Sequence, residues 1–549
     1  MKILIAYPNL PLMFSPAISV GIFTAIAKEQ ECEVDIFETT YYTNQFINRH
    51  IEMANVGANN GGYEDSKKIL TTRDPKNVIP DFKEKVESFK PDLILMSLTE
   101  NVYTQGIEML ESIREKNIPN IVGGVFARDG KRFLLKHDAV DQICHHEGEG
   151  VVRDAIQRLK ENKPLHDIPG TTYRFDDHAH VNPEQELCNL SEVMPDFSLF
   201  DQNRWIRPMG GRSFRTAIPM ETYRGCPYNC TYCNSPSQRA FSKENNQGNF
   251  MRRKSADVIE KELQHYLESY SPDLILFIDD SFLARPKKEL EEFSNMWSKY
   301  KVPFWMNTRV ENCSPEVLDM MNHAGIYRMT FGLESGNEQY RKEVLSRNVK
   351  QEVYHEYFEY INESDIPYSL NAIIGMPYET PSMIEDTARL VHRARGYDGV
   401  TISTFVPYVG TGLRTMAENA GFVDKDFTDD LEGGLLGNYV LNMPKPYVQS
   451  NEVYDYQKIF SLLAFFDESR WDEIKASLND KTKYQQLLDE YKSLHWSKYQ
   501  EGGKTRIKRI DKKIKSKYTE PSGIKAWSKG CAKHDESSSF RFEVMAAAS

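Results

Sequence analysis

The first 160 residues alternate between short apolar runs and stretches whose apolar residues recur at helical spacing. Apolar runs of this length are typical of strands buried in a parallel sheet. Their alternation with helical stretches predicts a doubly wound α/β sheet. The expected strands are 2–8, 33–39, 91–99, 117–127 and 139–150, and the expected helices are 20–30, 82–90 and 103–116.

Ligands of a doubly wound sheet bind at the carboxyl ends of its strands. Four residues fall at such ends and are candidates for ligand contacts: Asn9, Thr99, Gly123 and Glu147. The polar stretch 44–80 interrupts the alternation, and we expect an insertion loop or lid there.

The alternation pauses and then resumes further along the chain. Residues 161–214 lack a long periodic element, so we expect a linker with a small hairpin near 170–181. Residues 215–424 then carry six strand-helix steps, which predict a partial (β/α)6 barrel with its chemistry on the loops after the strands. The expected strands are 216–224, 273–279, 302–308, 327–334, 367–375 and 400–407, and the expected helices are 254–269, 287–299, 314–323, 351–363 and 382–395.

The last part of the chain, 425–549, has a mainly helical pattern. It includes a basic run at 504–517, which we expect to be a solvated terminal helix, with contact to an anionic substrate or partner as the alternative. The residues from about 530 have the composition of a disordered tail.

Composition and charge narrow the function classes. The chain has 549 residues, 40% hydrophobic and 27% charged, which is typical of globular proteins. Its formal net charge of −12 argues against a nucleic-acid partner, because phosphate contacts need positive faces. No apolar run approaches the roughly 20 residues of a membrane span, and the N-terminus lacks signal-peptide features. We therefore expect a cytoplasmic protein.

Three of the eight cysteines lie within one short segment: Cys226, Cys230 and Cys233. Three neighbouring thiolates can converge on a soft metal centre. A [4Fe–4S] cluster usually takes four, and no fourth cysteine is near, so one iron would be open for catalysis. A structural zinc site would need a fourth ligand at short spacing, and only His265 is available. We therefore expect an open-iron cluster rather than zinc or a chance grouping.

This spacing, on the loop after the first strand of a partial barrel, resembles the radical SAM superfamily. The resemblance implies that S-adenosylmethionine chelates the open iron through its amino and carboxylate groups. It implies that an electron from the cluster cleaves this cofactor to a 5′-deoxyadenosyl radical, which abstracts hydrogen from an unactivated C–H bond. It also implies an electron donor such as flavodoxin or ferredoxin.

Further segments match the family's pattern in the expected order. The family's glycine-rich segment after the second strand is not evident, which leaves recognition of the amino group open. Arg309, at the end of the third strand, pairs either with a carboxylate of S-adenosylmethionine or substrate, or with a surface acid. The resemblance implies these other positions: Tyr232 beside the adenine, Asp279 and Asp280 at the barrel mouth, Glu334 and Ser335 reaching the ribose and amino acid, and Ile374 in the fifth-strand segment against the adenine.

The N-terminal half resembles the cobalamin-binding domain of one radical SAM subfamily. The resemblance rests on IVGGVFA (121–127), HEGEG (146–150) and IPGTTYR (168–174). It implies that Gly123 and Gly124 let the backbone approach the corrin or its tail, with Glu147 and Gly148 nearby; an ordinary strand-to-helix turn is the alternative for the glycine pair. His145 and His146 flank the expected cleft.

One departure from the wider cobalamin pattern concerns the lower cobalt ligand. The loop at 8–21 contains neither Asp nor His, so the histidine of a DxHxxG motif is missing. Members of the radical SAM subfamily often lack it too. The absence suits methyl transfer from a low-coordinate cobalt, and it leaves open that the domain has lost cobalamin.

These observations favour a cobalamin-dependent radical SAM methyltransferase acting on a small molecule or peptide. The alternative with the same cofactors is a rearrangement or cyclisation without methyl transfer. A methylthiotransferase is disfavoured, because only Cys32 and Cys144 precede residue 150 and a second cluster needs more thiolates. A cobalamin or iron–sulfur sensor would need a recognisable DNA-binding module.

Overall fold

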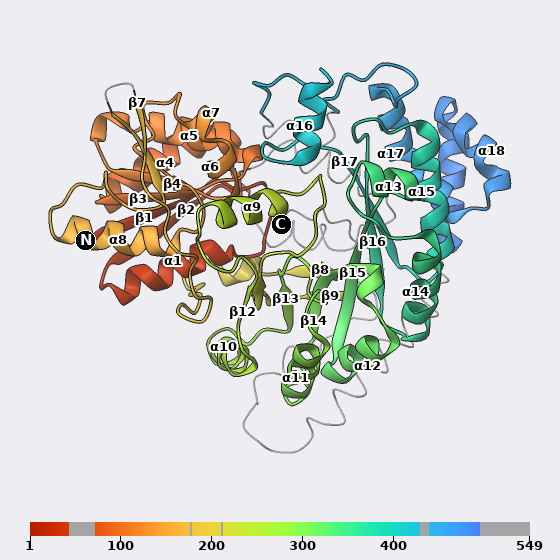
Figure 1. Cartoon of the computed structure of the whole chain (residues 1–549), viewed down its shortest axis with the longest axis horizontal. Helices are drawn as coiled ribbons and strands as arrows, with labels where there is room; N and C mark the ends of the chain where they lie inside the picture. Colours follow the sequence, from red (N-terminus) through yellow and green to blue (C-terminus); the bar gives the residue numbers. More distant parts are fainter. Residues whose placement is uncertain (12, 43–71, 176–177, 210–211, 429–438, 495–549) are drawn as a thin grey trace.

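A computed structural model describes residues 1–11, 13–42, 72–175, 178–209, 212–428 and 439–494. Most of the insertion expected at 44–80, the basic run at 504–517 and the tail from about 530 lie outside these residues. Two sheets organise the chain, one in the N-terminal third and one in the middle (Figure 1). Within the described residues, none of the helices combines the length and apolarity that crossing a bilayer demands.

The first sheet has the strand order β2-β1-β3-β4-β5-β6-β7, and its first five strands are parallel. This confirms the doubly wound sheet predicted from the apolar runs. The strands are β1 (Lys2–Tyr7), β2 (Glu33–Glu38), β3 (Leu93–Ser97), β4 (Asn120–Gly123), β5 (Gln142–Cys144), β6 (Thr171–Phe175) and β7 (His178–Val181).

Helices cover both faces of this sheet. Alternate residues of β1 and β3 face opposite ways, because side chains along a strand have a period of two. Ile3 and Ile5 therefore pack with α1 and α8, whereas Leu4 and Ala6 pack with α4 and α5. The helices are α1 (Ile18–Glu29), α4 (Val78–Phe89), α5 (Tyr103–Glu111), α6 (Val125–Asp129), α7 (Lys131–Leu134) and α8 (Glu149–Lys160).

The hairpin expected near 170–181 forms β6 and β7, and it extends the first sheet. β6 pairs antiparallel with β5, and β7 pairs antiparallel with β6. The sheet therefore continues into the segment expected to be a linker, because β5 offers an edge whose backbone groups need hydrogen-bond partners.

The second sheet has six parallel strands in the order β10-β13-β14-β15-β16-β17. This is the partial barrel expected from six strand-helix steps. Its strands are β10 (Ala217–Met220), β13 (Leu274–Phe277), β14 (Phe304–Thr308), β15 (Ile326–Glu334), β16 (Tyr368–Ile374) and β17 (Gly399–Thr404), and its outer helices are α10 (Ala256–Ser269), α11 (Lys287–Trp297), α12 (Pro315–Ala324), α14 (Gln351–Glu363) and α15 (Pro381–Ala394).

Short elements lie at both ends of these strands: β8 and β9 directly precede β10, whereas the others follow barrel strands. The sequence analysis did not predict them, and most have fewer than nine residues, which is too few for a clear periodic pattern. In Figure 1, α9 lies between the first sheet and the barrel. These elements are β8 (Arg207–Met209), β9 (Arg212–Phe214), β11 (Tyr223–Arg224), α9 (Ser235–Glu244), β12 (Arg252–Arg253), α13 (Glu338–Glu343) and α16 (Gly412–Asn419).

The described C-terminal region is helical, as predicted. α17 (Ser450–Phe465) packs against α15 and β17, and α18 (Trp471–Ala476) packs against α17. A further helix runs through 481–494. This region covers the far side of the barrel (Figure 1).

Candidate functional site

The cysteine segment begins directly after the first barrel strand. β10 ends at Met220, and the carboxylate of Asp279, at the end of β13, accepts from the backbone N–H groups of Thr222 (2.7 Å) and Tyr223 (3.1 Å). Gly225 then turns the chain at φ +101°, where a side chain would meet the carbonyl oxygen of Phe250 at 2.7 Å. The loop therefore leaves the barrel in one fixed direction.

Hydrogen bonds hold the cysteine loop from both sides. Arg239 of α9 donates to the carbonyl of Cys226 (2.6 Å), and the N–H of Ser235 donates to the sulfur of Cys233 (3.4 Å). On the other side, Thr231 donates its hydroxyl to the carbonyl of Val344 (2.7 Å). This bracing fixes the relative positions of the three thiols.

The spacing and protonation of the thiols bear on what they can bind. Within the described residues, the sulfur atoms of the three cysteines do not all lie within 4.8 Å of one another, which is the spacing expected of ligands that share a single ion. That spread fits a multi-iron cluster in which each thiolate binds a different iron. Burial raises the pKa of Cys226 to about 11 and of Cys233 to about 12, so metal loading must displace protons.

Arg309 lies next to the cysteine loop. Its guanidinium stacks 3.7 Å from the ring centre of Tyr228 and reaches to 4.0 Å from the sulfur of Cys230. It also pairs with Glu311 at 2.5 Å. Because Arg309 is only 8% exposed, this ion pair is not a surface salt bridge.

Glu334 and Tyr232 meet through an arginine that sequence reasoning missed. Glu334 ends β15 at φ +65°, beside a register shift in the pairing with β16. The buried Arg347 lies 3.7 Å from the carboxylate of Glu334 and donates to the hydroxyl of Tyr232 over 3.1 Å. Burial raises the pKa of Glu334, and the cations Arg347 and Arg309 oppose that shift.

No sequence pattern could have found Arg347. It lies in the loop between α13 and α14, outside any periodic element. Besides Tyr232, it donates to the carbonyl of Gly332 (2.5 Å) and the hydroxyl of Tyr354 (3.1 Å). Only the folded chain brings these groups around one guanidinium.

Two other expected residues lie at strand ends: Ser335 directly follows Glu334 at the end of β15, and Ile374 ends the neighbouring β16. Ser335 is fully buried, and its carbonyl accepts from Arg341 at 3.0 Å. Ile374 ends β16 and is also fully buried. After it, Gly375 turns at φ +81° and donates its N–H to Glu379 (2.6 Å). Both residues therefore shape the rim beside Glu334.

Buried polar atoms without hydrogen-bond partners gather at this rim. Within the described residues they include the hydroxyls of Ser281 and Thr308. These residues follow or end β13 and β14. Because a buried polar group without a partner costs about 1–3 kcal/mol, the rim is suited to a polar ligand such as the amino-acid part of S-adenosylmethionine.

The residues expected to face cobalamin are spread along the carboxyl end of the first sheet. Asn9 is engaged within the fold: its amide donates to Thr40 (2.9 Å) and to the carbonyl of Met13 (3.2 Å). Thr99, in contrast, is exposed.

The glycines at the carboxyl end of the first sheet differ in how much room each leaves for a side chain. Gly124 has φ +100°, and a side chain there would come within 2.6 Å of the backbone nitrogen of Leu98. A side chain at Gly148 would meet the ring of Phe23 at 2.7 Å. Gly123 has no such constraint, because its added carbon would touch Cys144 at an ordinary 3.5 Å.

Glu147 joins the first sheet to the barrel. Its carboxylate pairs with Arg252 of β12 and lies 3.0 Å from Arg224 of β11, which also pairs with Glu149 (2.9 Å). These arginines hold the pKa of Glu147 well below its usual range, against burial. Cys188 lies in the same cluster, but burial raises the pKa of its thiol, so the group is an ion-pair network rather than a metal site.

Unpartnered polar atoms also lie between the first sheet and α9. The ring of His146 stacks on Phe241 of α9 at 6.1 Å, and Arg128 of α6 lies 5.5 Å over the same ring. Both ring nitrogens of His146 and one terminal nitrogen of Arg128 have no hydrogen-bond partner among the described residues. His145 is engaged, because it bonds to Glu184 (2.5 Å) and Thr172. The interface therefore suits a ligand with polar groups.

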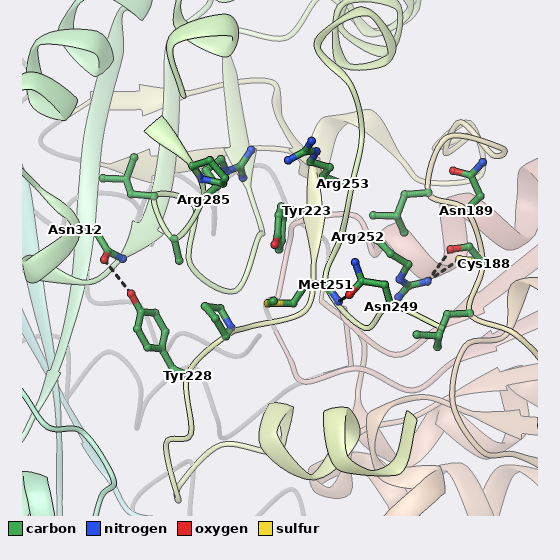
Figure 2. Close-up of a pocket in the computed structure, with 16 residues that line it drawn as sticks. Cys188, Asn189, Tyr223, Tyr228, Asn249, Met251, Arg252, Arg253, Arg285 and Asn312 are labelled. Carbon is green, nitrogen blue, oxygen red and sulfur yellow. Dashed lines mark hydrogen bonds between the residues drawn. The ribbon is translucent and has the colours of Figure 1, made fainter. Parts of the chain in front are cut away.

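A pocket of about 980 Å³ adjoins the cysteine loop (Figure 2). Pro227 and Tyr228, which follow Cys226 directly, form one wall. The others come from Tyr223, the segments 187–190 and 249–253, and the loops after β13 and β14. Sequence reasoning gave no signal for this pocket, because its walls come from segments far apart in the chain.

Comparisons with known proteins identify a family and several relatives that this chain resembles. Residues 220–391 match the family model of the radical SAM superfamily. An uncharacterized methyltransferase of Pyrococcus horikoshii is 23% identical over 342 residues, which cover 61% of this chain and 71% of the relative. Cytidylyl-2-hydroxyethylphosphonate methyltransferase of Streptomyces wedmorensis is 21% identical over 451 residues, which cover 74% and 79%.

A solved structure shares the fold across both sheets. It is the cobalamin-dependent S-adenosylmethionine radical enzyme OxsB, determined with aqua-cobalamin and S-adenosylmethionine bound. The two chains superpose with a TM-score of 0.59 at 16% identity, covering 88% of this chain and 71% of that one. The doubly wound sheet and the partial barrel thus occur together in another protein.

Proposed function

This chain carries a radical SAM domain, and on that premise we propose that it is a cobalamin-dependent methyltransferase. The methyl group would go to an unactivated carbon of a small molecule or peptide. The observation that carries the proposal is the braced loop of Cys226, Cys230 and Cys233 after β10, which contacts the barrel cations Arg309 and Arg347. The methyltransferase names of two relatives and the cobalamin in OxsB support it.

Residues of the barrel would hold the cluster and S-adenosylmethionine. The three thiolates would bind iron, and Arg309 would place positive charge beside Cys230. Glu334 offers a carboxylate for an ammonium group, while Arg309 lies where it can meet a carboxylate. Ile374 gives an apolar surface, and Arg347 fixes the ring of Tyr232 through its hydroxyl. When bound, these groups and cobalamin supply one-electron chemistry and a transferable methyl group.

The sheet-barrel interface would hold cobalamin. Thr99 is exposed and Gly123 is half-buried at the carboxyl end of the first sheet, and His146 and Arg128 offer unpartnered polar atoms between the sheet and α9. The ion pairs of Glu147 with Arg224 and Arg252 would keep the two parts together and exclude water. The cluster needs an external electron, for which we propose a flavodoxin or ferredoxin.

The test begins with cofactor content. The full chain is purified without oxygen, reconstituted with iron, sulfide and hydroxocobalamin, desalted, and examined by absorption spectroscopy. We expect a cluster and stoichiometric cobalamin. A cluster without cobalamin contradicts the methyltransferase proposal.

The second measurement separates methyl transfer from rearrangement. S-Adenosylmethionine and a reductant are added, and both nucleoside products are quantified. We expect 5′-deoxyadenosine together with S-adenosylhomocysteine, because only methyl donation yields the latter. 5′-Deoxyadenosine alone, with cobalamin retained, points to a rearrangement or cyclisation instead.

A further inference from the structure

The pocket beside the cysteine loop has an unusual lining for an acidic protein. None of its 16 lining residues is an aspartate or glutamate, although the chain has a net charge of −12. Three arginines and three asparagines contribute most of its polar groups. Such a wall is rich in hydrogen-bond donors, and it favours an occupant rich in acceptors.

The arginines are held in place from outside the lining. Arg252 pairs with Glu147, Arg285 with Asp279 (2.6 Å) and Arg253 with Glu289. Fixed guanidinium groups recognise oxyanions well, because little side-chain freedom remains to be lost on binding. The side chain of Arg253 is 56% exposed and stands at the mouth, whereas those of Arg252 and Arg285 are buried in the wall (Figure 2).

Two donors in this wall have no hydrogen-bond partner among the described residues. One is the Nε of Arg252, whose terminal nitrogens are used by Glu147 and the carbonyl of Cys188. The other is the amide nitrogen of Asn312, whose oxygen accepts from the hydroxyl of Tyr228 at 2.8 Å. Donors of this kind are stabilised when an acceptor enters, because leaving them unpaired is costly.

The rest of the lining is apolar, and it includes Leu187, Leu283 and Met251. The volume of about 980 Å³ lies within the range of small-molecule sites, which are concave and mix apolar walls with a few polar groups. A small organic anion therefore fits better than the convex surface of a protein.

We propose that this pocket binds the anionic part of the substrate, a phosphate or phosphonate group carried on an organic body. This inference rests on the proposed function and names a substrate class for it. Tyr228 links the pocket to the cluster site, because its ring lies under Arg309, which reaches the sulfur of Cys230. A substrate anchored here lies against the cysteine loop.

The test uses inorganic pyrophosphate as the probe and the full-length chain without added S-adenosylmethionine. Calorimetric titration measures its affinity for the wild type, for Arg253→Gln and for Asn312→Asp. We expect Asn312→Asp, which keeps the acceptor for Tyr228 but adds a negative charge, to weaken binding about tenfold or more. Arg253→Gln should weaken it about threefold to tenfold. Threefold to tenfold corresponds to about 0.7–1.4 kcal/mol, and tenfold or more to about 1.4 kcal/mol or more.

Arg114→Gln is the matched control, because Arg114 is similarly exposed at 60%, pairs with Asp138, and lies in the N-terminal unit. It should leave the affinity unchanged. No binding to the wild type, or equal affinity in all four proteins, overturns the proposal.

A last experiment distinguishes three outcomes: the pocket binds substrate, the same face docks an electron-carrier protein, or the proposed enzymatic function itself is wrong. Cleavage of S-adenosylmethionine is measured with dithionite and with reduced flavodoxin as electron sources. If Arg253→Gln lowers only the flavodoxin-supported rate and pyrophosphate does not bind, the face receives a protein and the substrate proposal is wrong. If the wild type does not cleave S-adenosylmethionine even with dithionite, the proposed function is wrong, whether or not pyrophosphate binds.

Discussion

Arg347 donates a hydrogen bond of 3.1 Å to the hydroxyl of Tyr232, two positions after Cys230. The same guanidinium lies 3.7 Å from Glu334 and 4.0 Å from Glu311. A single buried cation therefore ties the cysteine loop to the ends of two barrel strands. Its charge also balances two buried carboxylates, so its loss should be felt in both stability and site geometry.

Replacing Arg347 should cost far more stability than removing its bond to Tyr232. Arg347→Leu leaves the carboxylate of Glu334 without this cation and that of Glu311 with Arg309 alone, and we expect the free energy of unfolding to fall by about 3–5 kcal/mol. Tyr232→Phe removes one hydrogen bond, for about 1 kcal/mol. Urea unfolding followed by circular dichroism measures both. Equal losses in the two variants are inconsistent with the charge-balancing role.

Each of the three clustered cysteines should be necessary for iron binding. Cys226→Ala, Cys230→Ala and Cys233→Ala should each abolish cluster assembly and S-adenosylmethionine cleavage, because an iron left without its thiolate destabilises the cluster. Iron analysis and the visible absorption spectrum measure the effect.

Cys32→Ala and Cys313→Ala serve as the controls for this experiment. Both residues are buried and lie outside the cysteine loop, so their iron content should equal that of the wild type. Loss of iron in either would mean that the ligands are wrongly assigned. Full cleavage activity in any of the three loop variants would contradict the radical reaction.

The repeating part of the fold could be predicted from the sequence because each buried strand is a compact apolar run. The strand expected at 367–375 is β16, Tyr368–Ile374, and the helix expected at 351–363 has those bounds. The pairing of β6 with β5 could not be predicted, since it depends on a free sheet edge that exists only after the first five strands assemble.

The residues of the candidate site also fall into those that the sequence could predict and those that it could not. The cysteines could be found because their spacing is local, and Glu334 because the segment around it resembles the fourth-strand segment of the radical SAM superfamily. Arg347 and the ion pairs between Glu147 and Arg224 could not be found, because they join residues that are far apart in sequence without a periodic pattern. Long-range charge pairing is a property of the fold rather than of any segment.

The two adjacent glycines at the end of β4 should separate folding from cofactor binding. Gly124→Ala should destabilise the protein by about 1–3 kcal/mol, because φ is +100° and the added carbon would meet the backbone of Leu98. Gly123→Ala should leave stability unchanged or slightly higher, since its contact with Cys144 is ordinary.

Cobalamin retention gives the second readout for the glycine pair. If the backbone at Gly123 lies close to the corrin or its tail, the added methyl group should lower retained cobalamin in Gly123→Ala while the melting temperature stays unchanged. Unchanged retention in this variant would show that the cofactor does not approach the backbone there.

Glu379 should make the stability of the barrel depend on pH. The side chain is fully buried, and burial raises the pKa of Glu379 to about 8, against the N–H groups of Gly375 and Met376 that donate to its carboxylate. A raised carboxyl pKa means that the native state holds a proton that the unfolded state releases. Between about pH 4 and pH 8 this residue therefore favours folding less as the pH rises.

Glu379→Gln keeps an oxygen for the two N–H groups and removes the ionisation. The variant should gain stability relative to the wild type as the pH rises from 5 to 8, with no further gain above about 8. Urea midpoints at several pH values measure the difference, and Glu385→Gln on the neighbouring α15, where the carboxylate bonds to Tyr456, is the comparison. A stability difference between Glu379→Gln and wild type that stays constant across this range would mean that Glu379 is ionised throughout, with its charge balanced by a group other than these two amides.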